Sequence, residues 1–371
     1  MFSRRHVFIG VIVILLCIVL FFVYRGVLKK KEDSLLSTPE NPAHEILSKN
    51  SQSFIEAEAA KQNKQYGVAR EEYKQALGDA HDNVQKGLLD YLIGITYDME
   101  GNSVETVRSL KDIASNPNPE YTSEVRAYAL QYIGEIYFRY GANPEIIQTT
   151  FEGEPYSTFF VKDNPYLSYI HLFEYASEFK PLAVLELRIA EYYARQLGTV
   201  NTSPEQGKKA QAETYRSIIR EKINNAERDF QANADHPLKA GFAPKILMRK
   251  GSLLSRLYNI NETSFGDPEP AFQKSLELHR LKSNNSDGYA LYYYALFLAK
   301  HAPDRQADIE KLLKNFTDTD RYSGTDVLKF FANEKKDVLG QKKNLALLGE
   351  KFPPFRMLLT KLGWEEKDFI P

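Results

Sequence analysis

The sequence predicts an all-α fold built from stacked helix pairs, and two observations carry this prediction. No long run of residues alternates between apolar and polar at period two, which disfavours β-strands. Apolar residues instead recur three and four positions apart, and one ten-residue pattern occurs twice. Leu92–Gly101 reads LIGITYDMEG, and Tyr132–Gly141 reads YIGEIYFRYG. With 371 residues, the chain is long enough for a large core or two domains.

The chain begins with an apolar segment that predicts a membrane anchor. Residues 1–6 form a short basic tail, and residues 7–24 (VFIGVIVILLCIVLFFVY) carry no charge. As a helix, this segment would be about 27 Å long, close to the thickness of the hydrocarbon core of a bilayer. A cleaved signal peptide has a small-x-small site, which the following residues lack, and Leu16 is too large for a lipoprotein site at Cys17. We therefore predict one uncleaved transmembrane helix over residues 7–24.

The charges that flank this anchor give conflicting indications of its orientation. Arg4 and Arg5 precede it, whereas Arg25 and Lys29 to Lys31 follow it, so the positive-inside rule favours a cytoplasmic body. A six-residue tail before a single anchor is nevertheless typical of a bacterial protein whose body lies outside the cytoplasm. We expect this second arrangement, in the bacterial cytoplasmic membrane. Residues 25–50, which contain Pro39 and Pro42, are expected to form a linker.

The distribution of charge excludes some classes of function. The net charge is −1, but residues 1–31 hold six basic residues and no acidic ones. The remainder has 48 − 6 = 42 basic and 49 acidic residues, a balance of −7. A mildly acidic body argues against nucleic-acid binding, which needs a basic face. Cys17 is the single cysteine, so neither an internal disulfide nor a cysteine-based metal site can form.

The repeated pattern has the properties of a helix that packs closely against another. On a helix, Ile133 and Tyr137 fall on one face, and Gly134 lies beside it, where a neighbouring helix could approach. Gly141 is expected to end the helix, as glycine does at a C′ position. Each copy is thus interpreted as the first half of a helix–turn–helix pair. The second helices are expected over residues 102–115 and 142–151.

Both copies resemble the first helix of the tetratricopeptide repeat (TPR), a family of helix pairs of about 34 residues. The positions that match the family's pattern are Ile93, Gly94, Tyr97 and Gly101, then Ile133, Gly134, Tyr137 and Gly141. An earlier match comprises Ala57, Ala60, Tyr66, Ala69, Tyr73 and Ala76. The chain departs from the family at Asp90 and Leu130, where the family has Trp, and at Thr106, where it has Ala. Gly94 and Gly134 also lie 40 residues apart, a longer spacing than the family's.

The resemblance covers residues 51–151 and implies an α-solenoid of TPR-like repeats. Residues 152–371 are predicted to continue the helical repeats, with five to seven helix pairs in all. The last segment, NLALLGEKFPPFRMLLTKLGW, is predicted to be a C-terminal cap that covers the final apolar face. Within Tyr292–Tyr293–Tyr294, two rings are expected to pack between helices while the third faces water.

No catalytic or metal-binding constellation is predicted from the sequence. None of the seven histidines has a second His or Cys three or four residues later, so no metal site is expected on a helix face. There is no phosphate-binding glycine loop and no Gly-x-Ser-x-Gly nucleophile elbow. Neighbouring acidic residues such as Glu71 and Glu72 would point about 100° apart on a helix and make poor acid–base partners. We therefore expect neither an enzyme nor a bound cofactor.

The favoured function is a membrane-tethered TPR-like scaffold that binds a protein or peptide partner in its concave groove. The family resemblance implies that the first helix of each pair faces this groove. The groove candidates are Tyr91, Ile95, Tyr128, Gln131, Glu135 and Phe138. Two alternatives remain open. One is a cell-envelope enzyme or carbohydrate-active protein with an unrecognised site in residues 152–371, and the other is a purely structural assembly subunit.

Overall fold

The computed structural model describes most of the chain after residue 50. The described residues are 51–118, 121–201, 206–232, 243–283, 288–317, 338–361 and 363–369. The predicted tail, anchor and linker in residues 1–50 lie outside them. None of the helices in these ranges is both long and apolar enough to cross a membrane.

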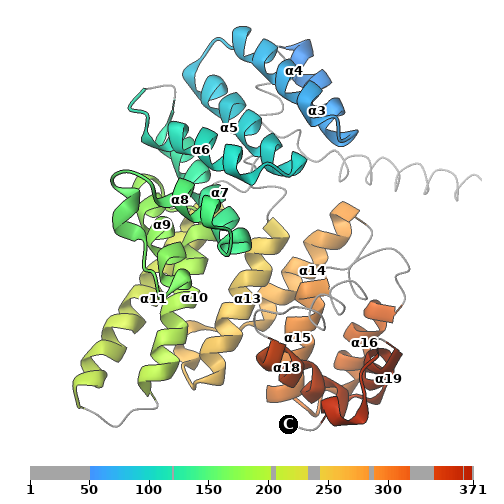
Figure 1. Ribbon diagram of the computed structural model, residues 1–371. Helices are drawn as coiled ribbons and strands as arrows, with labels where there is room; N and C mark the ends of the chain where they lie inside the picture. Colours follow the sequence, from blue (N-terminus) through green and yellow to red (C-terminus); the bar gives the residue numbers. More distant parts are fainter. Residues whose placement is uncertain are drawn as a thin grey trace, which may run out of the picture.

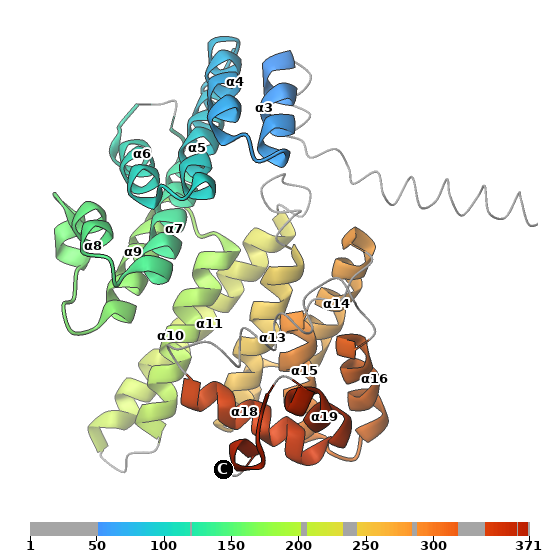
Figure 2. The ribbon, with the colours of Figure 1, turned by 45° about the vertical axis from the view of Figure 1, so that its right-hand side comes forward.

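The described part of the chain is all-helical, without a β-strand, which confirms the predicted fold class. Its helices pack in pairs, and the row of pairs curves from α3 at the upper edge to α19 at the lower right (Figures 1 and 2). The pairs are α3 (Gln52–Gln62) with α4 (Tyr66–Gly78), α5 (Asn83–Glu100) with α6 (Ser103–Ser115), α7 (Ser123–Tyr140) with α9 (Pro165–Phe179), α10 (Ala183–Asn201) with α11 (Gln206–Ala232), α13 (Ala243–Asn259) with α14 (Glu269–Ser283), α15 (Gly288–His301) with α16 (Gln306–Thr317), and α18 (Val338–Lys351) with α19 (Pro353–Lys361).

The partner of α7 differs from the one that the sequence predicts. A helix does form where it was expected after Gly141, as α8 (Pro144–Phe151), but it packs mainly on α6. The main partner of α7 is α9, which follows a short 3₁₀-helix at Tyr156–Phe159. α8 has only eight residues, too few to cover the eighteen-residue α7. α8 and the 3₁₀-helix are therefore an insertion within the third pair.

Local sequence explains where the two copies of the repeated pattern begin and end. Asp82 caps α5 by accepting a hydrogen bond from the backbone N–H of Gln85 at 2.8 Å, and Thr122 caps α7 in the same way. α5 ends at Gly101, whose φ of 96° favours glycine. Gly141 ends α7 as predicted, because the helix stops at Tyr140, but its φ of −65° is not the left-handed conformation that is typical of a C′ glycine. A Cβ atom at Gly141 would instead lie 2.6 Å from the carbonyl oxygen of Tyr137, so glycine is needed there for space.

Glycines in the first helices allow the second helices to approach closely, as the sequence predicts for Gly94 and Gly134. A Cβ atom added at Gly94 would lie 2.8 Å from Leu110 Cδ2 in α6, and one at Gly134 would lie 2.5 Å from Phe173 Cε1 in α9. Gly251 in α13 repeats this arrangement, because its Cβ would lie 2.7 Å from the ring of Phe272 in α14. The same close contact thus recurs in helix pairs that are far apart in the sequence.

The core runs along the stack of pairs in three groups of buried residues. The first extends from Phe54 in α3 to Ile189 in α10 and so spans both sides of residue 151. The second joins α10, α11 and α13, and the third runs from Phe272 in α14 to Phe369 near the C-terminus. α10 contributes Ile189 to the first group and Ala190 to the second. This helix therefore connects the N-terminal pairs to the C-terminal ones.

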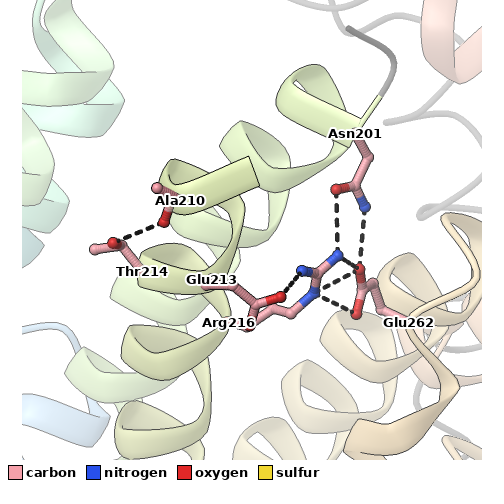
Figure 3. A network of polar contacts seen from close by, with 6 residues as sticks. All are labelled: Asn201, Ala210, Glu213, Thr214, Arg216 and Glu262. Atoms are coloured by element: carbon pink, nitrogen blue, oxygen red, sulfur yellow. Dashed lines mark hydrogen bonds and ion pairs between the residues drawn. The ribbon is translucent and has the colours of Figure 1, made fainter. Parts of the chain in front are cut away.

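A polar network fastens α11 to the turn after α13 (Figure 3). Arg216 Nη2 lies 2.6 Å from Glu262 Oε1, and Arg216 Nε donates to both oxygens of the same carboxylate at 2.9 and 3.0 Å. Asn201, at the end of α10, donates to Glu262 Oε1 at 3.0 Å. Such two-point pairing has a defined geometry. The network therefore holds three helices in register at the edge of the stack.

The glycine contact gives a test of helix packing. Gly134→Ala places a methyl group against the fully buried ring of Phe173, so we expect the free energy of unfolding to fall by about 1–3 kcal/mol. Gly78→Ala is a matched control, since no atom lies within 4 Å of its added Cβ, and it should change stability by less than about 1 kcal/mol or increase it. Urea unfolding of both variants measures the difference, and equal stabilities would contradict the close contact.

Candidate functional site

Three of the six predicted groove residues lie in the core. Tyr91 and Tyr128 are only 9 % and 7 % exposed, and their ring centroids are 6.1 Å apart. Ile95 is buried beside them in the first core group. Burial raises the pKa of Tyr91, and the nearby Tyr132 adds to the effect. These side chains pack α5 against α7 and offer little surface to a partner in this conformation.

The other three lie further along the same face of α7, at the spacing of a helical stripe. Gln131 and Glu135 are half-buried, whereas Phe138 is 44 % exposed. Glu135 Oε1 lies 3.8 Å from Arg188 Nη2 in α10, and the Arg188 guanidinium lies over the Phe138 ring at 5.8 Å. The structure thus brings Glu135 and Phe138 against α10. As partner-binding residues, all six stay a prediction.

Four arginines gather around Glu191, and we call them the arginine cluster; one of them, Arg188, contacts Glu135 and Phe138. Arg188 and Arg195 lie on α10, and Arg249 and Arg256 lie on α13. Each pair is seven residues apart, which places both members on one face of their helix. α10 packs on α13 (Figure 2), and Arg195 and Arg256 both lie within 4 Å of Glu191, so the two faces lie side by side.

Glu191 is the main counter-charge of the arginine cluster. Its carboxylate lies 3.1 Å from Arg195, 3.5 Å from Arg188 and 3.9 Å from Arg256. Burial opposes ionisation of Glu191, but the surrounding arginines outweigh it and lower its pKa to about 2. Glu191 is therefore ionised at every physiological pH and neutralises part of the cluster.

The arginine cluster keeps an excess of positive charge. Four arginines face two carboxylates, Glu135 and Glu191, and no described residue forms a hydrogen bond or ion pair with Arg249. Burial and the charge of Arg188 lower the pKa of Arg249. The Nε atoms of Arg188 and Arg256 are also buried, with no acceptor among the described residues. A half-buried excess of cations in a protein whose body is acidic is typical of a site for anions.

A pocket of about 280 Å³ adjoins the arginine cluster at Arg256, and we call it the Tyr293 pocket. Its walls come from α13, α15 and α18, which lie next to one another in the stack. Tyr292 and Tyr294 are buried, whereas Tyr293 is half-buried and lines the pocket, so two rings of this trio pack in the core as predicted. The lining residues are Ser252, Ser255, Arg256, Asn259, Tyr293, Leu296, Phe297, Lys300, Asn344 and Leu347.

Neither the arginine cluster nor the Tyr293 pocket was predicted from the sequence. The arginines had one visible signal, since Arg188 and Arg195 share a seven-residue spacing with Arg249 and Arg256. That spacing alone is common on solvated helix faces. Only the packing of α10 on α13 makes the two stripes into one cluster.

The described ranges contain no group of three or more His, Cys, Asp and Glu side chains that could hold a metal ion. His301 contacts Asn259, a lining residue of the Tyr293 pocket. Its Nε2 atom lies 2.6 Å from Asn259 Oδ1, and burial lowers its pKa. His301 thus orients a pocket residue and belongs to no ligand set.

Comparison of the chain with protein-family models, with curated proteins and with solved structures finds no match in any of the three. The resemblance to TPR proteins therefore rests on the repeated residues and on the packed helix pairs. The arginine cluster and the Tyr293 pocket are the features of the described residues that bear on function.

The position of Glu191 gives a pH-dependent prediction. A carboxyl group whose pKa falls from 4.5 to about 2 on folding stabilises the protein above pH 4.5, and loses this effect as the pH falls toward 2. Glu191→Gln should therefore lower the free energy of unfolding by about 2–3 kcal/mol near pH 7. The difference from the wild type should shrink by about 1 kcal/mol for each pH unit between 4.5 and 2.

Urea unfolding at several pH values measures this difference. Glu277→Gln is a suitable control, because Glu277 is 57 % exposed and pairs with Lys274 on the surface. We expect the control to change stability by less than about 1 kcal/mol at any pH. A Glu191→Gln effect that does not depend on pH would disprove the ionic role of this residue.

Proposed function

We propose that the protein is a membrane-tethered scaffold of TPR-like helix pairs that binds a protein or peptide partner along its first helices, without catalysis. One observation carries the proposal. Side chains on α7, α10, α13 and α15 form a continuous row of half-buried or exposed charged and aromatic groups. The members of this row include Phe138, Arg188, Glu191, Arg256 and Tyr293. Rows of this kind, rich in Arg and aromatic residues, are typical of binding hot spots.

The packing of the helices supports the TPR-like assignment. In several of the pairs, a glycine of the first helix packs against a large apolar side chain of the second helix. Gly94 contacts Leu110 in this way, and Gly251 contacts Phe272. In TPR proteins the first helices line the concave groove, which is where the row lies in this proposal. The insertion between α7 and α9 is a departure from the family's simple alternation.

The membrane tether of the proposal is the apolar segment 7–24. Its length and lack of charge suit a single transmembrane helix, and residues 25–50 would link it to the first pair. We place the helical body outside the cytoplasm of a bacterial cell. The scaffold would then present its row to partners at the outer face of the cytoplasmic membrane.

The shifted carboxyl groups favour binding over acid–base catalysis. Glu191, Glu262 and Glu269 have lowered pKa values, and each lies beside an arginine. A general acid or base works best with a pKa near the operating pH, which for a carboxyl group requires a raised value. These three groups are instead held ionised, as expected for residues that pair charges.

Removal of residues 1–31 tests the tether. We expect the truncated protein to leave the membrane fraction and to be helical and monomeric, because the apolar segment has been removed while every described helix is kept. Fractionation followed by circular dichroism and light scattering gives the result. A truncated protein that stays with the membrane would contradict the tether.

Site-specific photocrosslinking tests partner binding. A photoreactive phenylalanine analogue at Phe138 lies in the row and should crosslink one partner in native membranes. The same analogue at Val68 is the control, because Val68 is 52 % exposed but lies on the second helix α4. Equal crosslinking from both positions, or none from Phe138, would contradict binding along the first helices.

A further inference from the structure

Several of the polar groups that line the Tyr293 pocket have weak partners or none in the described part of the protein. The hydroxyl groups of Ser252 and Ser255 make no hydrogen bond to a described residue, and Lys300 forms no ion pair with one. Arg256 has one ionic contact, a long one of 3.9 Å to Glu191, and its buried Nε atom has no described acceptor. Buried or half-buried polar groups are normally paired, so these groups are available for a ligand.

The positive charge of the lining residues favours an anionic ligand. Arg256 and Lys300 line the pocket, and no carboxylate does. Arg249 and Glu191 both lie close enough to Tyr293 to influence its ionisation, so one further positive charge behind the pocket is offset by one negative charge. The two cationic side chains that line the pocket therefore keep a net positive charge, which would repel a cation or metal ion and stabilise an anion.

The remaining wall of the pocket is apolar and aromatic. Tyr293, Leu296, Phe297 and Leu347 supply it, opposite the hydroxyl and amide groups of α13. A ligand that fits both walls has an apolar face and several hydroxyl groups. At about 280 Å³ the cavity lies near the lower limit for small-molecule sites, which suits a single sugar ring better than a folded partner.

We propose that the Tyr293 pocket binds a small hydroxylated anion, either a sugar carboxylate or a sugar phosphate. Arg256 and Lys300 bind the anionic group, the serine hydroxyls and Asn259 bind ligand hydroxyls, and the sugar face packs on Tyr293. This site goes beyond the proposed scaffold function and does not depend on it. The crosslinking experiment at Phe138 can succeed while the pocket stays without a ligand, and the reverse is also possible.

Isothermal titration calorimetry of the full chain in detergent micelles tests the pocket. The probes are glucuronate, glucose 6-phosphate, glucose and inorganic phosphate. We expect at least one of the two sugar anions to bind with a Kd below about 1 mM, and glucose and phosphate alone to bind at least about tenfold more weakly. The better of the two sugar anions identifies the anionic group.

Two variants and one control locate the binding. Lys300→Gln changes an exposed side chain without a described partner, so it should fold normally and weaken sugar-anion binding about tenfold. Arg256→Gln should weaken it by the same factor or more. Arg108→Gln removes one positive charge from α6, outside the pocket, and should leave binding unchanged.

Several results would overturn the proposal. Equal binding of glucose and glucuronate would mean that the anionic group is not recognised, and equal binding of phosphate and glucose 6-phosphate would exclude a role for the sugar ring. Failure of both sugar anions to bind, or wild-type affinity in Lys300→Gln and Arg256→Gln, would also overturn it. Tighter binding of a glutamate-rich peptide than of either sugar anion would assign the pocket to a peptide groove instead.

Discussion

None of the described helix pairs can bury both of its apolar faces by itself, and the rest of the described structure follows from this constraint. Each pair must therefore pack against the next one, which gives a curved row of pairs with a core that runs along it. Glycines make the packing within pairs close. At Gly94, Gly134 and Gly251 a single methyl group would clash with a buried side chain of the partner helix.

α10 carries two opposite roles because it lies in the middle of this row. One side of the helix is packed between two core groups and holds Glu186, a fully buried carboxylate. Lys222 lies 3.3 Å from this carboxylate, Asn225 donates to it at 3.1 Å, and Ser177 also donates to it. A buried charge is tolerated only with such partners. The other side of α10 carries Arg188 and Arg195, whose positive charge is only partly neutralised.

The Glu186 side of α10 stabilises the fold, whereas the arginine side is suited to binding. Around Glu186 every charge has a partner, and the contacts join α9, α10 and α11 into one unit. In the arginine cluster the cations outnumber the carboxylates, and Arg249 forms no hydrogen bond or ion pair with a described residue, although the charges of Glu135 and Glu191 act on it from a distance. Folding alone does not explain a half-buried excess of positive charge. A ligand or partner that supplies negative charge would account for it, and the Tyr293 pocket next to the cluster provides the space.

The sequence by itself determined the helical class, the close contacts at Gly94 and Gly134, and the burial of two of the three tyrosines at 292–294. These features follow from local rules, since helical spacing, glycine and apolar content act within one or two turns.

Other features depended on which helices pack against each other in the tertiary structure. α9 rather than α8 pairs with α7, Gly141 is needed for space rather than for a positive φ, and Tyr91 is buried by α7. The arginine cluster is of the same kind. Arg188 and Arg249 lie far apart in the chain, and only the packing of α10 on α13 brings their charges together, because electrostatic interactions depend on distance in space and not on separation in sequence.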